Sequence, residues 1–318
     1  MTTKTIGSKS RSQPLQELPA EHKKRITPKR PRDYACWAIA IAIVGGLIAT
    51  TVTNENYHWP VVFEYFTADA ILQGLVLTLF LTVVSMVLGT LLGLLLAIMR
   101  MSHQTPISGL ATLYITFFRG TPVLVQLIFW FNIAALYPKL SIGIPFTDIS
   151  TPVDVNALMT PLTAAIVGLT LNEAAYMAEI IRGGFASVGR GQFEAADSLG
   201  MRGFTRLRHV IIPQTMPAII PATGNQVIGM LKGTSLVSVL GVAELLNSAQ
   251  SIYARNYQTI PLLIVASIWY LIMTLALSVP QSMIERRFSR STRRQAAVTT
   301  AVTPPAGQPV AATKESLL

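Results

Sequence analysis

The sequence is poor in charged residues and contains almost no cysteine. Charged residues make up 13% of the 318 residues and hydrophobic residues 51%, whereas soluble domains carry about 25% charged residues. This composition excludes an ordinary soluble domain and indicates a membrane protein. The single cysteine, Cys36, excludes an intrachain disulfide.

The sequence also lacks the patterns that bind metals or nucleotides. Its four histidines are scattered, with no pair at a metal-ligand spacing and no cysteine cluster beside them. A phosphate-binding loop reads Gly-x4-Gly-Lys-Ser/Thr, and no lysine in this chain follows a glycine. We therefore expect no metal, no cofactor bound by this chain and no enzymatic activity of its own.

The net charge of +10 reports membrane orientation and not nucleic-acid binding. If both termini lie in the cytoplasm, 21 of the 25 Lys and Arg residues fall in cytoplasmic segments, as the positive-inside rule requires. Only Lys139 and Arg255 then lie outside, and Arg119 and Lys232 lie within spans. We therefore expect a multi-pass protein with a cytoplasmic N-terminus and C-terminus and no nucleic-acid partner.

Six segments are long and apolar enough to cross a bilayer as helices, which takes about 20 residues each. They are Tyr34–Val52, Ile71–Ile98, Ile107–Tyr137, Pro161–Ile181, Pro217–Ala249 and Pro261–Ile284. The expected fold is thus an all-α membrane protein with six transmembrane helices. Gly89 and Gly93 in the second segment predict a close-packing face for another helix.

The expected organisation is an added anchor before a compact core. The first helix, residues 34–52, is separated from the others by a polar stretch, so residues 71–286 form a five-helix core. Residues 1–33 and 287–318 are polar and basic, and we expect disordered cytoplasmic tails there. The outer loop 138–160 either contacts a partner or is a solvated insertion.

A polar island, residues 192–213, separates two long apolar segments. It begins with Glu194 and Asp197 and continues into Arg202, Arg206 and Arg208, an order that suits the dipole of a short helix. Ala196 and Gly200 share one helical face because residues four apart are neighbours. Such a smooth face lets another backbone approach closely, although a charged loop between membrane helices is most often simply solvated.

The residue order of this island resembles the EAA loop of membrane subunits of ABC importers. Glu194-Ala195-Ala196 is followed by three residues, Gly200, nine residues and then Val210-Ile211-Ile212-Pro213. The family pattern is Glu-Ala-Ala-x3-Gly-x9-Ile-x-Leu-Pro, so the chain departs only by Val for Ile and Ile for Leu. The resemblance implies a type I ABC importer permease core whose loop contacts a separate ATPase. The implied contact residues are Gln192, Glu194, Ala195, Ala196, Asp197, Leu199, Gly200 and Arg202.

Two further blocks are similar to the amino acid branch of these importers. Phe118-Arg119-Gly120-Thr121-Pro122 is followed by Val-Leu-Val-Gln, and Ala175-Tyr176-x-Ala178-Glu179-x-x-Arg182-Gly-Gly precedes the EAA loop. A third block, Leu231-Lys232-Gly233-Thr234-Ser235-Leu236, departs from the family by Gly233 in place of Asp. Glu179 and Arg182 are expected to form an i,i+3 ion pair.

Ionisable residues within spans mark the candidate translocation path, because charge in lipid is costly unless it faces a partner or a cavity. The candidates are Arg119, Glu173, Tyr176, Asn225 and Lys232. For Glu173 a helix–helix hydrogen bond is the alternative role.

The resemblance implies alternating access in the bacterial inner membrane, driven by a partner. ATP and Mg²⁺ would be held by a homodimeric ABC ATPase, and an extracytoplasmic solute-binding protein would deliver the solute. A second permease copy or a paralogue would complete the path, with lipid around it. The rival reading is an ion-coupled secondary transporter of small polar solutes. The amino acid itself is not identified by the sequence.

Overall fold

The computed structural model describes residues 31–143 and 150–302. The described residues divide into two units, one up to residue 57 and one from residue 58 onward, which are described separately. Most of the expected N-terminal tail, residues 1–30, lies outside the described residues, as does the end of the expected C-terminal tail, residues 303–318.

The first unit is one apolar helix, α1 (Pro31–Thr53), followed by the short 3-10 helix η1 (Glu55–Tyr57). The hydroxyls of threonines near its end donate hydrogen bonds to backbone carbonyls of the preceding turn. Thr51 Oγ1, for example, donates to the Leu47 carbonyl at 2.8 Å. Residues 34–53 are apolar enough to span a membrane, and none of their side chains is buried. The length and apolar composition of α1 suit a membrane span.

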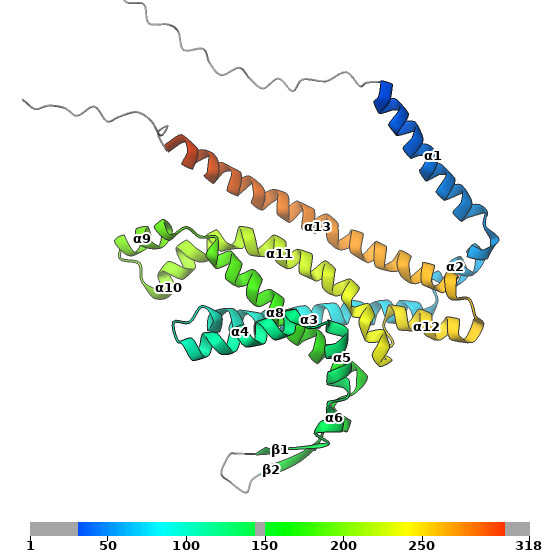
Figure 1. Cartoon of the computed structure of the whole chain (residues 1–318), viewed down its shortest axis with the longest axis horizontal. Coiled ribbons are helices and arrows are strands. Elements are labelled where there is room, and N and C mark those ends of the chain that lie inside the picture. The colour runs from blue at the N-terminus through cyan, green and yellow to red at the C-terminus, as the bar shows by residue number, and fades with distance from the viewer. Residues whose placement is uncertain (1–30, 144–149, 303–318) are drawn as a thin grey trace, which may run out of the picture. The chain divides into compact units, whose positions relative to one another are not determined.

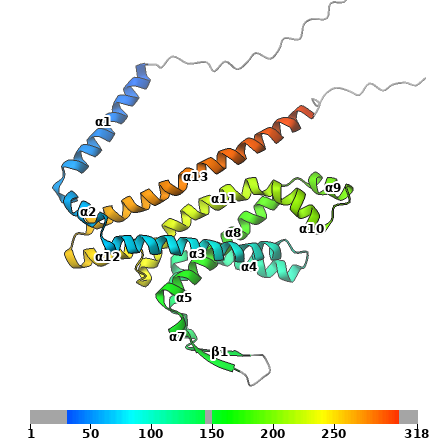
Figure 2. The same ribbon diagram turned by 180° about the vertical axis from the view of Figure 1, so that it is seen from behind.

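The second unit is a set of helices of very different lengths (Figures 1 and 2). In chain order they are α2 (Trp59–Phe66), α3 (Asp69–Arg100), α4 (Thr105–Gly120), α5 (Val123–Phe131), α6 (Ile133–Leu136), α7 (Val155–Leu158), α8 (Pro161–Ala186), α9 (Arg190–Ser198), α10 (Gly203–Arg206), a π-helical turn (Leu207–Ile211), α11 (Ile212–Gly233), the 3-10 helix η3 (Thr234–Leu240), α12 (Leu245–Asn256) and α13 (Thr259–Val302). Helices α9 and α10 lie at one end of the unit, and α2 and α12 lie at the other.

Helix α8 is the centre of the packing and contacts α3, α4, α5 and α11. Its contact with α3 is the most extensive and depends on the two glycines predicted to pack closely. A Cβ atom on Gly93 would lie 2.7 Å from the Met177 Cβ and 2.9 Å from the Ala174 carbonyl oxygen. A Cβ on Gly89 would lie 2.9 Å from the Glu173 Cβ. The close-packing face is therefore confirmed, with α8 as the partner.

Two of the expected spans are bent. Four helices of the described residues are long and apolar enough to cross a membrane, and the number rises to six if each bent pair counts as one span. The α4–α5 pair bends by 103° at the Gly120–Pro122 break, and the second pair, residues 203–240 with α12, bends by 44°. The first break is the one that Gly120 and Pro122 predict, because proline cannot donate to the preceding turn.

Two features differ from the expected arrangement. Strands β1 (Lys139–Gly143) and β2 (Ser150–Asp154) pair antiparallel within the expected outer loop, and this hairpin projects away from the helices (Figure 1). Among the described residues this hairpin is thus the one pair of strands, and all other regular elements are helices. Helix α13 continues to Val302, into the segment expected to be a disordered tail. Residues 287–302 contain no proline or glycine, so no helix-breaking residue ends the helix at the apolar boundary.

The α3–α8 contact yields a stability prediction. Gly93→Leu should lower the Tm in detergent, because overpacking a tight contact costs about 1–3 kcal/mol. Gly109→Leu is the matched control, since an added Cβ at Gly109 meets nothing within 4 Å. Equal Tm losses for the two variants would contradict the packing account.

Candidate functional site

The loop between α9 and α10 is shaped by two glycines in left-handed backbone conformations. Gly200 has φ of +74° and Gly203 has φ of +52°, which residues with a Cβ rarely adopt. The Gly200 amide donates to the Asp197 carbonyl at 2.9 Å, and the Met201 amide donates to the Ala196 carbonyl at 3.0 Å. This cap ends α9 and returns the chain towards α11.

An ion pair, a cation–π contact and a hydrogen bond between polar side chains stabilise the loop. Arg206 forms an ion pair with Asp197 at 2.5 Å, and its guanidinium lies 5.8 Å from the centroid of the Phe193 ring. Gln214 Nε2 donates to Gln192 Oε1 at 3.0 Å, which joins α9 to α11. Of the predicted contact residues, Asp197 thus bonds to Arg206 and Gln192 to Gln214 of α11, and both Asp197 and Gln192 are solvent-exposed.

The outer surface of the loop is exposed and partly apolar. Seven of the eight predicted contact residues are exposed, and the eighth, Ala196, is 2% exposed. Leu199 is 76% exposed and Phe204 is 70% exposed, on either side of the Gly200 turn. Phe204 was not among the predicted contacts, although an aromatic residue in a polar loop is itself a signal. Exposed apolar groups gathered on one loop are typical of a partner-binding surface.

A small cavity of about 220 Å³ lies between α8 and α11 and contains a buried carboxylate. Glu173 is 4% exposed, and Gln226 Nε2 lies 3.3 Å and 3.4 Å from its two carboxylate oxygens. Within the described residues, Glu173 forms no ion pair. The lining residues are Val123, Leu169, Asn172, Glu173, Tyr176, Gln226, Gly229, Met230 and Gly233. Glu173 therefore both bonds to a neighbouring helix and faces a cavity.

A second cavity of about 420 Å³ carries positive charge. It is lined by Arg100, Thr112, Ile115, Thr116, Arg119, Gly120 and Glu179. The Arg119 guanidinium lies 5.4 Å from the centroid of the Tyr176 ring, and Tyr176 lines the first cavity. The Arg119–Tyr176 contact thus links the cationic cavity to the one that holds Glu173. The predicted ion pair between Glu179 and Arg182 is confirmed at 2.8 Å.

The other two path candidates lie on the exposed side of α11. Asn225, Gly229 and Lys232 are exposed and share one helical face because they are four and three residues apart. Neither Asn225 nor Lys232 lines either cavity. The structure therefore brings Arg119, Tyr176 and Glu173 together. It places Asn225 and Lys232 outside both cavities, on a face of α11 that reaches the Glu173 cavity through Gly229.

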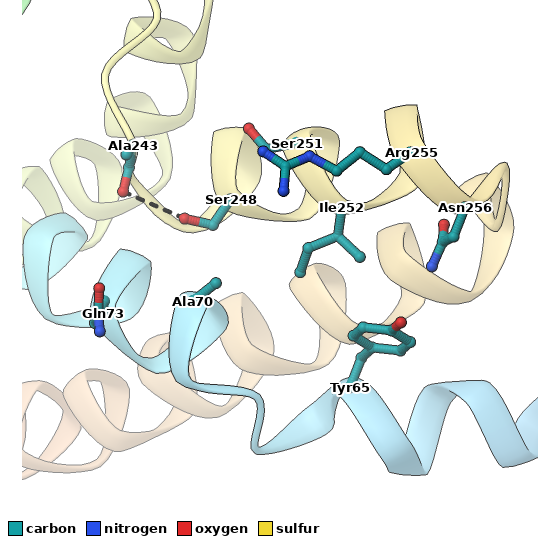
Figure 3. Close-up of a pocket in the computed structure, with 9 residues that line it drawn as sticks. All are labelled: Tyr65, Ala70, Gln73, Ala243, Ser248, Ser251, Ile252, Arg255 and Asn256. Atoms are coloured by element: carbon teal, nitrogen blue, oxygen red, sulfur yellow. Dashed lines mark hydrogen bonds between the residues drawn. The ribbon is translucent and has the colours of Figure 1, made fainter.

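A third cavity, of about 440 Å³, lies at the end of the unit away from α9 and α10 (Figures 1 and 3). It is lined by Tyr65, Ala70, Gln73, Ala243, Ser248, Ser251, Ile252, Arg255 and Asn256. Ser248 Oγ donates to the Ala243 carbonyl at 3.3 Å. Arg255 is its one formally charged lining residue and makes no ion pair within the described residues.

Beside this cavity a fully buried carboxylate caps α12. Glu244 accepts from the amides of Leu246 at 2.9 Å and Asn247 at 2.8 Å, and from the Tyr270 hydroxyl at 2.7 Å. A carboxylate at a helix N-terminus is favoured by the helix dipole. Glu244 thus fixes the start of α12 to α13.

The described residues hold no group of three or more potential metal ligands. The buried carboxylates Glu173 and Glu244 are instead satisfied by amide and hydroxyl donors. A carboxylate bonded in this way does not need a metal to be stable.

Comparison with known proteins identifies the family. The sequence model described as "Binding-protein-dependent transport system inner membrane component" matches residues 89–290. The arginine transport system permease protein ArgU of Corynebacterium glutamicum is 37% identical over 91% of this chain and 87% of its own length. The probable amino-acid permease protein YxeN of Bacillus subtilis is 38% identical over 75% of this chain and 99% of its own length. The chain belongs to the family of binding-protein-dependent transport system inner membrane components.

Solved structures agree with this assignment. A crystal structure of an amino acid ABC transporter with histidines is 41% identical, with a TM-score of 0.58, and the match covers 69% of this chain and 94% of that one. An inward-facing methionine transporter, MetNI, has a TM-score of 0.54 at 18% identity, which shows the fold alone. The resemblance to importer permeases of the amino acid branch is therefore confirmed, and the rival secondary transporter is not favoured.

Proposed function

We propose that this permease passes amino acids into the cytoplasm and that a separate ABC ATPase homodimer, with ATP and Mg²⁺, drives it. The proposal rests on the relatives named above and on the exposed α9–α10 loop. Both termini would lie in the cytoplasm, in keeping with the distribution of Lys and Arg. The α9–α10 loop then faces the compartment that contains ATP.

The single observation that carries the proposal is the exposed apolar pair on this loop. Leu199 and Phe204 flank a turn that is held by Asp197 and Arg206. A loop braced from within can transmit a push without unfolding. Helix α9, which leads into this loop, is joined to α8 through only the three residues 187–189. Closure of the ATPase dimer would therefore move α8, which carries Glu173 and Tyr176.

The two linked cavities suit a zwitterionic solute. Arg119 offers guanidinium donors to a carboxylate, and the Glu173 carboxylate can accept from an ammonium group. Tyr176 lies between them. We assign Arg119, Glu173 and Tyr176 to the path within one permease. The exposed α11 face with Asn225 and Lys232 would border the path towards a second permease copy or a paralogue.

The opposite end of the unit would receive the solute-binding protein. The third cavity contains polar side chains and one cation, Arg255, that forms no ion pair within the described residues, and this cation fits an acidic side chain of the docked protein. Arg255→Glu should raise the concentration of loaded binding protein that half-stimulates ATP hydrolysis, by about tenfold, through like-charge repulsion. Arg255→Lys should change it little. An unchanged value for Arg255→Glu would place docking elsewhere.

The role of Glu173 can be separated from its helix–helix hydrogen bond. Glu173→Gln keeps the size and a hydrogen bond to Gln226 and removes the charge. Amino acid uptake should fall about tenfold or more, because a charged hydrogen bond contributes about 1.5–3 kcal/mol. Glu64→Gln is the control, since Glu64 is exposed on α2. Wild-type uptake by Glu173→Gln would show that the charge of Glu173 is not needed for transport and that the residue only joins α8 to α11.

The experiment that tests the proposal is ATP-driven uptake of labelled amino acids into proteoliposomes. These would hold this chain, its ATPase and its binding protein, with Phe204→Asp compared with the wild type. We expect Phe204→Asp to lower uptake and ATPase stimulation together by about tenfold, because a buried unpaired charge in an interface is costly. His209→Asp, an exposed change in the neighbouring turn, is the control.

Uptake by the wild type without an ATPase, driven by an ion gradient, would overturn the proposal. So would uptake that Phe204→Asp leaves unchanged, because the α9–α10 loop would then not be the coupling surface.

A further inference from the structure

The break between α4 and α5 leaves a backbone carbonyl without its usual donor. In a continuous helix the Phe118 carbonyl would accept from the amide of residue 122, but Pro122 has no amide hydrogen. The chain is also extended at Thr121, with φ of −114° and ψ of 146°. Phe118 is buried, so water cannot readily replace the missing donor.

A glutamine side chain supplies the missing bonds. Gln126 Nε2 lies 3.0 Å from the Phe118 carbonyl oxygen, 3.1 Å from the Thr121 carbonyl oxygen and 2.7 Å from Thr121 Oγ1. The side chain is 4% exposed. Gln126 therefore joins the end of α4 to the first turn of α5 across the bend.

An asparagine from a distant helix completes the cluster. Asn172 Nδ2 on α8 donates to the Phe118 carbonyl at 3.0 Å and to Gln126 Oε1 at 3.1 Å. The Phe118 oxygen thus has two side-chain donors, and Gln126 uses both its amide nitrogen and its amide oxygen. A glutamate or leucine at position 126 could not do this, because neither carries N–H donors.

This cluster adjoins both cavities of the proposed path. Arg119 directly follows Phe118 and lines the cationic cavity. Asn172 directly precedes Glu173, and Asn172 and Val123 both line the cavity that contains it. The same hydrogen bonds that hold the 103° bend therefore also fix where Arg119 stands relative to Glu173.

We propose that Gln126 and Asn172 are positioning residues. Their side-chain amides replace the N–H donor that Pro122 lacks, and this keeps the Arg119 side chain in place beside the path. This inference rests on the proposed function for the role of the path, whereas the hydrogen-bond replacement stands on geometry alone. The two parts can be tested separately.

The replacement is tested by a double-mutant cycle of Pro122→Ala with Gln126→Leu. Gln126→Leu in the otherwise native chain should lower the Tm in detergent by about 5 °C, because a buried carbonyl loses a donor. Pro122→Ala lets helix α4 continue through residue 122, whose amide then donates to the Phe118 carbonyl, so in this background the same change should cost less than half as much. Equal Tm losses in the two backgrounds overturn the replacement.

Positioning is tested by transport kinetics on folded protein, selected by gel filtration. Gln126→Leu and Gln126→Glu should both raise the KM for amino acid uptake about tenfold or more, because small misplacements of a binding group are costly. They should also lower the number of amino acids moved per ATP. A purely structural role would reduce only the yield of folded protein.

The matched control is Asn132→Leu. Asn132 Nδ2 also donates to a backbone carbonyl, that of Ile128 at 2.8 Å, but it is exposed at the far end of α5. Wild-type KM and coupling in Gln126→Leu, or an equal change in Asn132→Leu, would overturn positioning. Absence of uptake by the wild type would instead count against the proposed function, while the Tm cycle still decides the replacement.

Discussion

The structure depends on one constraint, which is that backbone polar groups removed from water must find partners. Unbroken helices meet it internally, and each break in a helix needs an outside donor or acceptor. At the α4–α5 bend Gln126 and Asn172 provide it. At the start of α12, Glu244 accepts from the free amides of the first turn, and on α13 Gln281 Nε2 adds a bond to the Pro221 carbonyl of α11 at 2.8 Å. Of these partners Gln126, Gln281 and Glu244 are buried, and Asn172 is half-buried.

Because most of these partners come from another helix, the breaks also cross-link the bundle. Helix α8 benefits most. It packs on the glycines of α3, bonds to the α4–α5 bend through Asn172, and carries Glu173 and Tyr176 to the cavities. Only residues 187–189 separate its end from α9. In the proposed function, this short link lets a push on the α9–α10 loop reach Glu173 and Tyr176.

Local patterns allowed much of this to be predicted from the sequence. The apolar segments, the α4–α5 break at Gly120 and Pro122, the Gly89 and Gly93 contact and the Glu179–Arg182 pair all depend on residues close together in the chain. The partner of the glycines was open, because helix pairing is not encoded locally. The β1–β2 hairpin was not foreseen, since a proline-containing loop gives no clear strand alternation.

The site was predicted less completely, for the same physical reason. Gln126 and Asn172 are 46 residues apart, so the residues around either one do not predict their contact. Glu173 was a candidate from its place in a span, but its bond to Gln226 and its cavity required the packing of α11. The spacing of Asn225 and Lys232 places them on one helical face, but the direction of that face depends on the rotation of α11, which the sequence does not give.

The central claim is that the α9–α10 loop engages an ATPase while the opposite end engages a binding protein. The chain has one cysteine, so a Cys36→Ser background accepts a single photo-crosslinker at a cysteine introduced at position 204 or at position 255. With both partners present in proteoliposomes, position 204 should capture the ATPase and position 255 the binding protein. Capture of the binding protein at 204, or no ATPase there, would contradict the account.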